Sequence, residues 1–325
     1  MKVCIYGAGA IGGWIGVALA QAGERLNVVA RGATLEALRR DGLSLMRGDV
    51  RTRVPVNAVA DPAELGEQDL VVVAVKAPAL AGVAERIGPL LGPDTIVLVA
   101  MNGVPWWFLQ GGFGGALAGT RLATVDPEGA IAAAIPDRHV IGGVVHASCS
   151  LDAPGVVRHH FGNGLIIGEP SGEATPRVKQ LLALFTRAGI DTKLSAQIQK
   201  DVWFKLWGNM TVNPVSALTG AATDRILGDE LLLGFISAVM LEAKEIGARI
   251  GIAITDSPDD RHAVTRKLGA FKTSMLQDVE AGRAVELDAL VGAVRELGQL
   301  TKVPAPFTDA LLGLARVQAR QLGLY

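Results

Sequence analysis

Hydrophobic residues in the first half of the chain form short, nearly continuous runs. Four of these runs, KVCIYGAG, RLNVVARG, DLVVVAVKA and TIVLVAMNG, have the length of strands, and IGGWIGVALAQAG between the first two has a helical period. Apolar runs this short are typical of strands buried on both faces of a parallel sheet with helices on each side. The pattern predicts a doubly wound α/β domain.

The pattern changes at about Gly142, where turn residues separate strand-like pieces without intervening helices up to Glu169. We interpret these pieces as added, antiparallel strands. A helix over 175–188 and a short strand over 191–194 complete a first domain of residues 1–195. From residue 196 to residue 325 the apolar period is almost wholly helical, with glycine and proline punctuation, and it predicts an all-α domain.

The composition excludes several kinds of protein. With 325 residues, half of them hydrophobic, the chain can bury a substantial core. A formal net charge of -1 and the lack of a basic run with interleaved aromatic residues argue against a nucleic-acid partner. No apolar run is long enough to span a membrane, and the N-terminus lacks the apolar region of a secretory signal, so we expect a cytoplasmic location.

Neither the two cysteines nor the five histidines have the spacing of a metal site, so no metal is expected. Cys4 and Cys149 are interpreted as small buried residues. Oligomeric state is not encoded in a recognisable motif, although the surplus leucine of the helical half is compatible with a homodimer.

A glycine-rich turn follows the first predicted strand. The segment GAGAIG, Gly7 to Gly12, fits G-x-G-x-x-G and opens a helix, which is the context that makes this pattern a Rossmann-type dinucleotide site. Gly7 allows the tight turn, Gly9 lets the pyrophosphate approach the backbone, and Gly12 lets helix and strand pack closely. With Ala10 and Ile11, these glycines form the predicted cofactor loop, and the alternative is a tight turn without a ligand.

The residue after the second strand decides which nicotinamide cofactor is expected. An acidic residue there would hydrogen-bond the ribose 2'-hydroxyl of NAD, but the chain has Arg31. A guanidinium matches a 2'-phosphate in charge and geometry, so we predict NADP(H), against the alternative of a solvated arginine. Lys76 and Asn102 also follow central strands and border the ligand edge of such a sheet, although each alone could be an ordinary loop residue.

The segment DVWFKLWGNMTVNPVSALTG, Asp201 to Gly220, reads as a helix that is apolar nearly all round. Lys205, Asn209 and Asn213 nevertheless follow one another at four-residue spacing and form a polar strip. Buried ammonium and amide groups are costly unless they meet a partner or a ligand. The strip therefore predicts a ligand site, with Pro214 disfavouring α geometry at Asn213 and favouring a kink there.

Two further polar residues occur in apolar surroundings. Glu286 in AVELDALVGAVRELGQL aligns with an apolar stripe of one helix face, although a glutamate in a first turn is also common because it complements the helix dipole. Ser274 lies between Phe271 and Met275, where a hydroxyl that bonds its own backbone is the alternative.

Together these segments resemble the ketopantoate reductase family, the 2-dehydropantoate 2-reductases. The resemblance rests on the glycine-rich start, the arginine after the second strand, VK, NGV, and the more specific KLWGNMTVNP, TSMLQD and VELDAL, and it covers nearly the whole chain. It implies a Rossmann domain followed by an α-helical domain, with NADPH as cofactor and a 2-oxo acid, 2-dehydropantoate (ketopantoate), as substrate.

By the same resemblance, Lys205 is the lysine that protonates the substrate carbonyl, and Glu286 is its catalytic companion. The residues implied to bind substrate are Asn209, Asn213, Ser274, Glu286 and Asn102, and those near the cofactor include Lys76 and Asn102. A cation that can also give up a proton suits this reaction, because hydride addition to a ketone leaves negative charge on its oxygen. Burial should lower the pKa of Lys205 and a nearby Glu286 should raise it, and the sequence leaves the net direction open.

The chain departs from the family pattern after NGV, where an unusually aromatic and glycine-rich segment contains Trp106 and Trp107. These tryptophans either line the substrate site or anchor the packing, so the identity of the 2-oxo acid stays open. Two other functions are therefore kept: an NADPH-dependent reductase of a different 2-oxo acid, and a non-catalytic NADP-binding sensor. The sensor needs none of four polar residues that the chain has together, which argues against it: Lys205, Asn209, Ser274 and Glu286.

Overall fold

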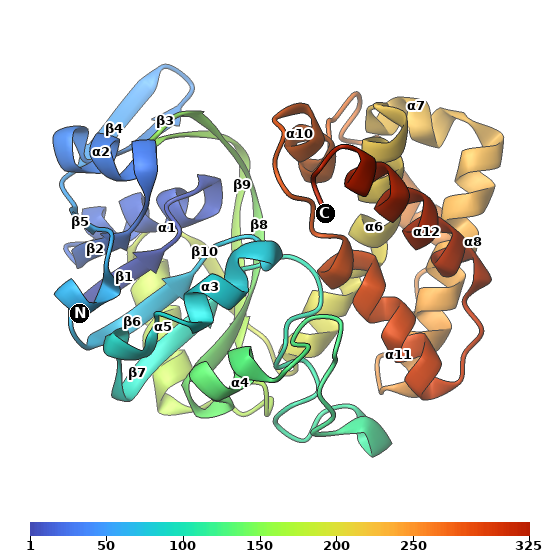
Figure 1. Ribbon diagram of the computed structural model, residues 1–325, viewed down its shortest axis with the longest axis horizontal. Helices are drawn as coiled ribbons and strands as arrows, with labels where there is room; N and C mark the ends of the chain where they lie inside the picture. Colours follow the sequence, from blue (N-terminus) through green and yellow to red (C-terminus); the bar gives the residue numbers. More distant parts are fainter. The chain divides into compact units, whose positions relative to one another are not determined.

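The computed structural model describes residues 1–325 and divides the chain into two compact units (Figure 1). The first consists of Met1–Met101 and Gly129–Asp201, and the second of Asn102–Glu128 and Val202–Tyr325. The structural division therefore falls after Asp201 rather than after residue 195. The structure also assigns the segment Asn102–Glu128 to the second unit, which a linear division into 1–195 and 196–325 does not do.

One mixed sheet of ten strands forms the centre of the first unit, with β10 paired to β9 off the path β4-β3-β9-β8-β7-β6-β1-β2-β5. The strands are β1 Lys2–Tyr6, β2 Arg25–Val29, β3 Leu43–Arg47, β4 Val50–Val54, β5 Asn57–Val59, β6 Gln68–Val73, β7 Leu91–Val99, β8 Val140–Ala153, β9 Val156–Gly168 and β10 Asp191–Leu194. The run from β5 through β2, β1, β6 and β7 to β8 is parallel. This run has the strand order of a doubly wound Rossmann sheet, as predicted.

The strands added after Gly142 pair as predicted. β8 and β9 form a long antiparallel hairpin, and β10 lies parallel to β9 over the predicted residues 191–194. The hairpin of β3 and β4 was not predicted from the sequence. Its strands carry Arg47, Arg51 and Arg53, and β4 is largely exposed at the sheet edge, so the apolar pattern that identifies a buried strand is missing.

Five α-helices belong to the first unit: α1 Ala10–Gln21, α2 Gly32–Asp41, α3 Leu80–Ala84, α4 Ala130–Ala134 and α5 Pro176–Arg187. The predicted helix over 175–188 matches α5, whose N-cap Thr175 accepts a hydrogen bond from the backbone N–H of Val178. Helix α1 is mostly buried, with Trp14, Ile15 and Leu19 fully enclosed in the core of this unit.

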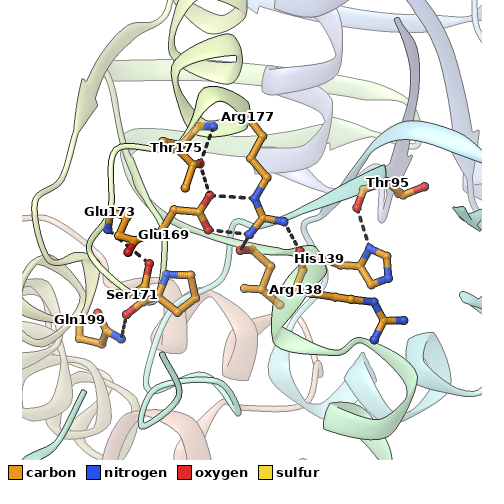
Figure 2. Close-up of polar contacts among 12 residues, drawn as sticks. Thr95, Arg138, His139, Glu169, Ser171, Glu173, Thr175, Arg177 and Gln199 are labelled. Carbon is orange, nitrogen blue, oxygen red and sulfur yellow. Dashed lines mark hydrogen bonds and ion pairs between the residues drawn. The ribbon is translucent and has the colours of Figure 1, made fainter. Parts of the chain in front are cut away.

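A partly buried ion pair joins Arg177 in the first turn of α5 to Glu169, the residue after β9 (Figure 2). The Arg177 guanidinium donates to both carboxylate oxygens of Glu169, with Nε 2.7 Å from Oε1, and also to the backbone carbonyls of Arg138 and Val140. The Thr175 hydroxyl donates to the same carboxylate. Because removing Arg177 would leave the buried Glu169 carboxylate without its cationic partner, these contacts keep the start of α5 against the end of β9.

The second unit is helical, as the sequence predicts. It contains α7 Thr223–Gly228, α8 Glu230–Arg249, α9 Pro258–Arg266, α10 Ser274–Glu280, α11 Ala293–Thr301 and α12 Pro306–Gln321, with a π-helical turn over Asp288–Gly292. Helix α6, Ile198–Thr219, carries Trp203, Leu206, Trp207 and Met210 into the core, and the Trp207 indole donates to the Met240 carbonyl at 2.7 Å. None of the helices combines the length and apolar character needed to cross a membrane.

Helix α6 continues through Pro214, so the expectation that Asn213 leaves α geometry is wrong. Asn213 and Pro214 are both buried by the surrounding helical unit. Tertiary packing of a long apolar helix therefore outweighs the local preference of a residue that precedes proline.

The aromatic segment Asn102–Glu128 packs into the helical unit. Trp106 and Trp107 are 4% and 1% exposed, and the ring of Phe108 lies 5.9 Å from that of Trp203. The backbone N–H groups of Ala123 and Thr124 donate to the Glu296 carboxylate. Of the two interpretations left open by the sequence, the burial of both tryptophans supports the one in which they are packing anchors.

Candidate active site

The polar strip of α6 lies on a helix that is otherwise part of the core. Lys205 and Asn209 are partly exposed, whereas Asn213 is buried with 7% of its surface accessible. One turn separates each from the next, so the ammonium and the two amides share one side of the helix. The strip predicted from the sequence is present and directed away from Trp203 and Trp207, which are enclosed in the core.

The ammonium of Lys205 donates a hydrogen bond to the side-chain oxygen of Asn102 at 2.8 Å. Asn102 is held in place because the two residues that follow it, Gly103 and Val104, pack against Ala289 of the π-helical turn. Gly103 has a φ of +84°, and a Cβ there would lie 2.6 Å from the Ala289 carbonyl oxygen. The N–H of Val104 donates to the same carbonyl at 2.8 Å. Only glycine fits at position 103 without moving Asn102 away from Lys205.

Glu286 lies two residues before this π-helical turn rather than in the first turn of a regular helix. It is 7% exposed, and its carboxylate acts electrostatically on Lys205. The backbone around it is fixed, because the Glu286 carbonyl accepts from Leu290 and the neighbouring Val285 N–H donates to the Leu324 carbonyl. Single π-helical turns are frequent at functional sites, where they redirect side chains.

Ser274 is the first residue of α10 and is exposed, and its hydroxyl accepts a hydrogen bond from the Asn213 amide at 3.4 Å. The structure therefore brings Ser274 to the far end of the polar strip. Thr273, not Ser274, caps the helix, accepting from the Leu276 N–H. All five predicted residues of the helical unit, together with Asn102, thus belong to one region: Asn102, Lys205, Asn209, Asn213, Ser274 and Glu286.

Burial lowers the pKa of the Lys205 ammonium to about 8, against the raising effect of Glu286 and with a further lowering by Arg261. This settles the direction that the sequence left open. Below pH 8 the side chain is mostly protonated, so it can hold a developing negative charge and give up a proton at neutral pH. The effect of Arg261 on Lys205 could not be predicted from the sequence, because an arginine in SPDDRHAV is typical of a solvated helix start.

The predicted cofactor loop connects β1 to α1 in the first unit. Gly7 has a φ of +101° and Gly9 is the N-cap of α1, with no side-chain cap and no acidic residue in the first turn. A Cβ at Gly12 would lie 2.1 Å from the Gly7 carbonyl oxygen, whereas one at Gly9 would meet nothing within 4 Å. The loop therefore offers an uncapped helix N-terminus with open space beside it, which fits the pyrophosphate of a dinucleotide.

Arg31 and Lys76 follow the neighbouring strands of this loop. Arg31 comes after β2, is exposed, and is the N-cap of α2. Lys76 comes after β6, and a Cβ at Gly7 would lie 2.6 Å from Val75 beside it. The strand order reverses between β1 and β6, and in open α/β sheets ligands bind at the carboxyl ends of the strands at such a point.

The comparisons with known proteins agree over the whole chain. Two family models match, "Ketopantoate reductase PanE/ApbA" over residues 3–172 and "Ketopantoate reductase PanE/ApbA C terminal" over residues 197–319. The chain belongs to the ketopantoate reductase family. Members of this family use NADPH, and the resemblance stated from the sequence is confirmed.

Individual relatives of the ketopantoate reductase family are similar along their full length. A 2-dehydropantoate 2-reductase of Mesorhizobium japonicum is 46% identical over 100% of both chains. The crystal structure of a putative ketopantoate reductase from Ralstonia solanacearum MolK2 is 57% identical, covers 100% of this chain and 99% of its own, and has a TM-score of 0.96. A D-mandelate dehydrogenase solved with NADH and anilino(oxo)acetate shares the fold at 21% identity and a TM-score of 0.85.

Nowhere in residues 1–325 do three histidine, cysteine, aspartate or glutamate side chains come together in a group that could hold a metal ion.

Proposed function

We propose that this chain reduces ketopantoate (2-dehydropantoate) to pantoate with NADPH, a reaction of pantothenate biosynthesis. The observation that carries the proposal is the arrangement of Lys205, Asn102 and Glu286. It supplies a proton donor whose pKa is about 8, an amide that orients it and a carboxylate that acts on its charge. Membership of the ketopantoate reductase family supports the choice of substrate.

In the proposed mechanism, NADPH supplies the hydride when it is bound. Lys205 stabilises the negative charge that develops on the ketone oxygen and donates a proton to it. Asn102 fixes the direction of the ammonium, and Glu286 favours its charged form, which opposes the effect of burial. The amides of Asn209 and Asn213 and the hydroxyl of Ser274 bind the other polar groups of the substrate.

The first unit is the proposed NADP-binding part and the second the proposed substrate-binding and catalytic part. The residues assigned to the cofactor are Gly7, Gly9, Ala10, Ile11, Gly12, Arg31, Lys76 and Asn102. The uncapped start of α1 supports pyrophosphate binding, and the exposed guanidinium of Arg31 supports recognition of the 2'-phosphate.

Replacing Arg31 by alanine should weaken NADPH binding by roughly 10- to 100-fold and NADH binding by less than about threefold, because only NADPH carries the 2'-phosphate. Dissociation constants from nicotinamide fluorescence titration measure both. Arg25→Ala is the matched control, since Arg25 is an exposed arginine at the opposite end of β2. Equal losses for the two cofactors would contradict the assignment of Arg31.

The pH dependence of reduction follows from Lys205. Its pKa of about 8 means that kcat/KM for the 2-oxo acid should be level near pH 7 and fall roughly tenfold per pH unit well above pH 8, as the ammonium loses its proton. Glu286→Gln removes the group that raises this pKa, so the descending limb should move to lower pH. A limb that stays in place or moves to higher pH in this variant would contradict the proposed coupling.

The substrate is tested by a panel of 2-oxo acids under steady-state conditions with NADPH. Ketopantoate is compared with pyruvate, 2-oxoisovalerate and a bulkier aromatic 2-oxo acid. The highest kcat/KM for ketopantoate supports the proposal. A preference for another member would keep the chemistry of Lys205 and change the substrate, and bound NADPH without turnover of any member would favour the sensor.

The oligomeric state and the cellular location of this chain stay predictions. The ketopantoate reductase of Staphylococcus aureus, whose structure has the same fold, is a dimer. We propose a homodimer for this chain, supported by the exposed apolar side chains of Leu231 on α8 and of Leu314 and Val317 on α12. We also propose a cytoplasmic location, as expected from the sequence.

A further inference from the structure

Arg261 lies on α9 with its guanidinium against the backbone of α6. A Cβ at Gly208 would fall 2.6 Å from Nε and 2.8 Å from Nη2 of this arginine, so the absence of a side chain at position 208 makes room for it. The guanidinium carbon also lies 5.5 Å from the centre of the Phe204 ring. Gly208 lies about one helical turn after Lys205, and the charge of Arg261 acts on Lys205, so the guanidinium adjoins the Lys205 end of the polar strip of α6.

One hydrogen-bond donor of the Arg261 side chain, Nε, lacks an acceptor. Its Nε is buried and has no hydrogen-bond partner, while the side chain as a whole is partly exposed. A desolvated cationic donor without a partner is costly, and an arginine held in this way is typical of a group that receives an anion. The Phe204 ring fixes one side of the guanidinium, which limits the entropy lost when a ligand binds.

The charges around Arg261 favour an anionic ligand. Its positive charge acts on Lys205, so two cations influence the same end of the strip. Glu286 is the carboxylate that acts on Lys205, and Asp256 is the one that acts on Arg261. The difference between the two cations is geometric: Lys205 donates to Asn102, whereas Nε of Arg261 has no hydrogen-bond partner despite the charge of Asp256, so Arg261 keeps a donor for a carboxylate of the substrate.

We propose that Arg261 binds the carboxylate of the 2-oxo acid and determines the preference of this enzyme for acids over neutral ketones. This inference rests on the proposed function. It adds a specificity-determining residue that the motifs of the polar strip do not include. A guanidinium can hold a carboxylate through two parallel hydrogen bonds, which would also orient the adjacent ketone toward Lys205.

The test compares a 2-oxo acid with its primary amide, which has nearly the same shape and no charge. The probes are ketopantoate and ketopantoamide, measured by steady-state kcat/KM with NADPH and by calorimetric binding to the protein saturated with NADP+. Arg261→Gln should lower kcat/KM and affinity for the acid roughly 10- to 100-fold, mainly through KM, and change those for the amide by less than about threefold. Arg261→Lys should recover part of the loss.

A second variant tests the same idea without removing the charge. Gly208→Ala places a methyl group where the guanidinium lies, and alanine stabilises a helix interior relative to glycine, so the fold should be retained. It should also reduce the preference for the acid over the amide. The controls are Arg266→Gln, an exposed arginine of α9, and Gly234→Ala, a glycine of α8 with nothing within 4 Å of an added Cβ.

The outcomes separate this inference from the proposed function. Equal losses for acid and amide in Arg261→Gln, or no loss for either, would overturn the role of Arg261 while leaving the reductase activity intact. If the unmodified enzyme turns over neither probe, the proposed function fails. The binding measurement then still decides the role of Arg261, because equal affinities of the unmodified protein for acid and amide would overturn it.

Discussion

Replacing Lys205 by alanine should lower kcat for ketopantoate reduction by roughly 100-fold or more, with NADPH affinity changed by less than about threefold. In the proposed mechanism, the alanine variant removes both the positive charge beside the ketone oxygen and the proton that the product alcohol requires. Lys205 has these two properties together because burial lowers its pKa to about 8 while its bond to Asn102 fixes its position. Stopped-flow reduction with saturating NADPH measures the loss directly.

One further variant separates the charge of Lys205 from its proton donation, and a second serves as a control. Lys205→Arg keeps a positive charge but cannot give up a proton at neutral pH, so it should remain well below the unmodified enzyme. Lys200→Ala, which removes an exposed lysine from the first turn of the same helix, should have no effect on kcat. A Lys205→Ala variant with near-normal kcat would remove this residue from the mechanism.

Replacing Gly12 by alanine should abolish measurable NADPH binding and lower the free energy of unfolding by about 1–3 kcal/mol. The new Cβ would lie 2.1 Å from the Gly7 carbonyl oxygen and 3.0 Å from the Ile5 side chain, so the backbone of the loop must move. Because this loop forms the start of α1, its displacement also shifts the N–H groups that we assign to the pyrophosphate. Chemical denaturation and fluorescence titration measure the two effects separately.

Gly9→Ala is the matched control for Gly12→Ala. A Cβ at Gly9 meets no protein atom within 4 Å, so the stability of the protein without cofactor should be unchanged. NADPH affinity should still fall, because the added methyl group occupies space that the pyrophosphate needs. Loss of stability in both variants, or in neither, would contradict this account of the loop.

The fold was largely predictable because its signals are local. The apolar runs of β1, β2, β6 and β7 identify buried strands, and Thr175 followed by proline marks the start of α5. The β3–β4 hairpin was missed because β4 is largely exposed and both strands carry arginines that interrupt an apolar pattern. The regular helix through Pro214 could not be predicted either, since tertiary packing decides it.

The candidate site was predictable as a set of residues and not as an arrangement. Four-residue spacing placed Lys205, Asn209 and Asn213 on one side of a helix, which is a property of the helix alone. That Gly103 packs against Ala289, and so delivers Asn102 to Lys205, depends on a contact between residues far apart in the sequence.

The direction of the Lys205 pKa shift and the position of Arg261 could not be obtained from the sequence for the same reason. Both depend on burial and on groups that come from other helices. The role of the two tryptophans after Asn102 also needed the structure. Their position in the sequence fitted both a substrate site and a packing role, and their burial favours packing.

The central claim is that hydride passes from NADPH to C2 of ketopantoate on this protein. The most direct measurement incubates the purified enzyme with ketopantoate and NADPH deuterated at the transferring position of C4, and analyses the product by mass spectrometry. The account predicts pantoate with one deuterium at C2, formed in equal amount to NADP+. Pantoate without deuterium, or no pantoate while NADPH remains bound and unoxidised, would contradict it.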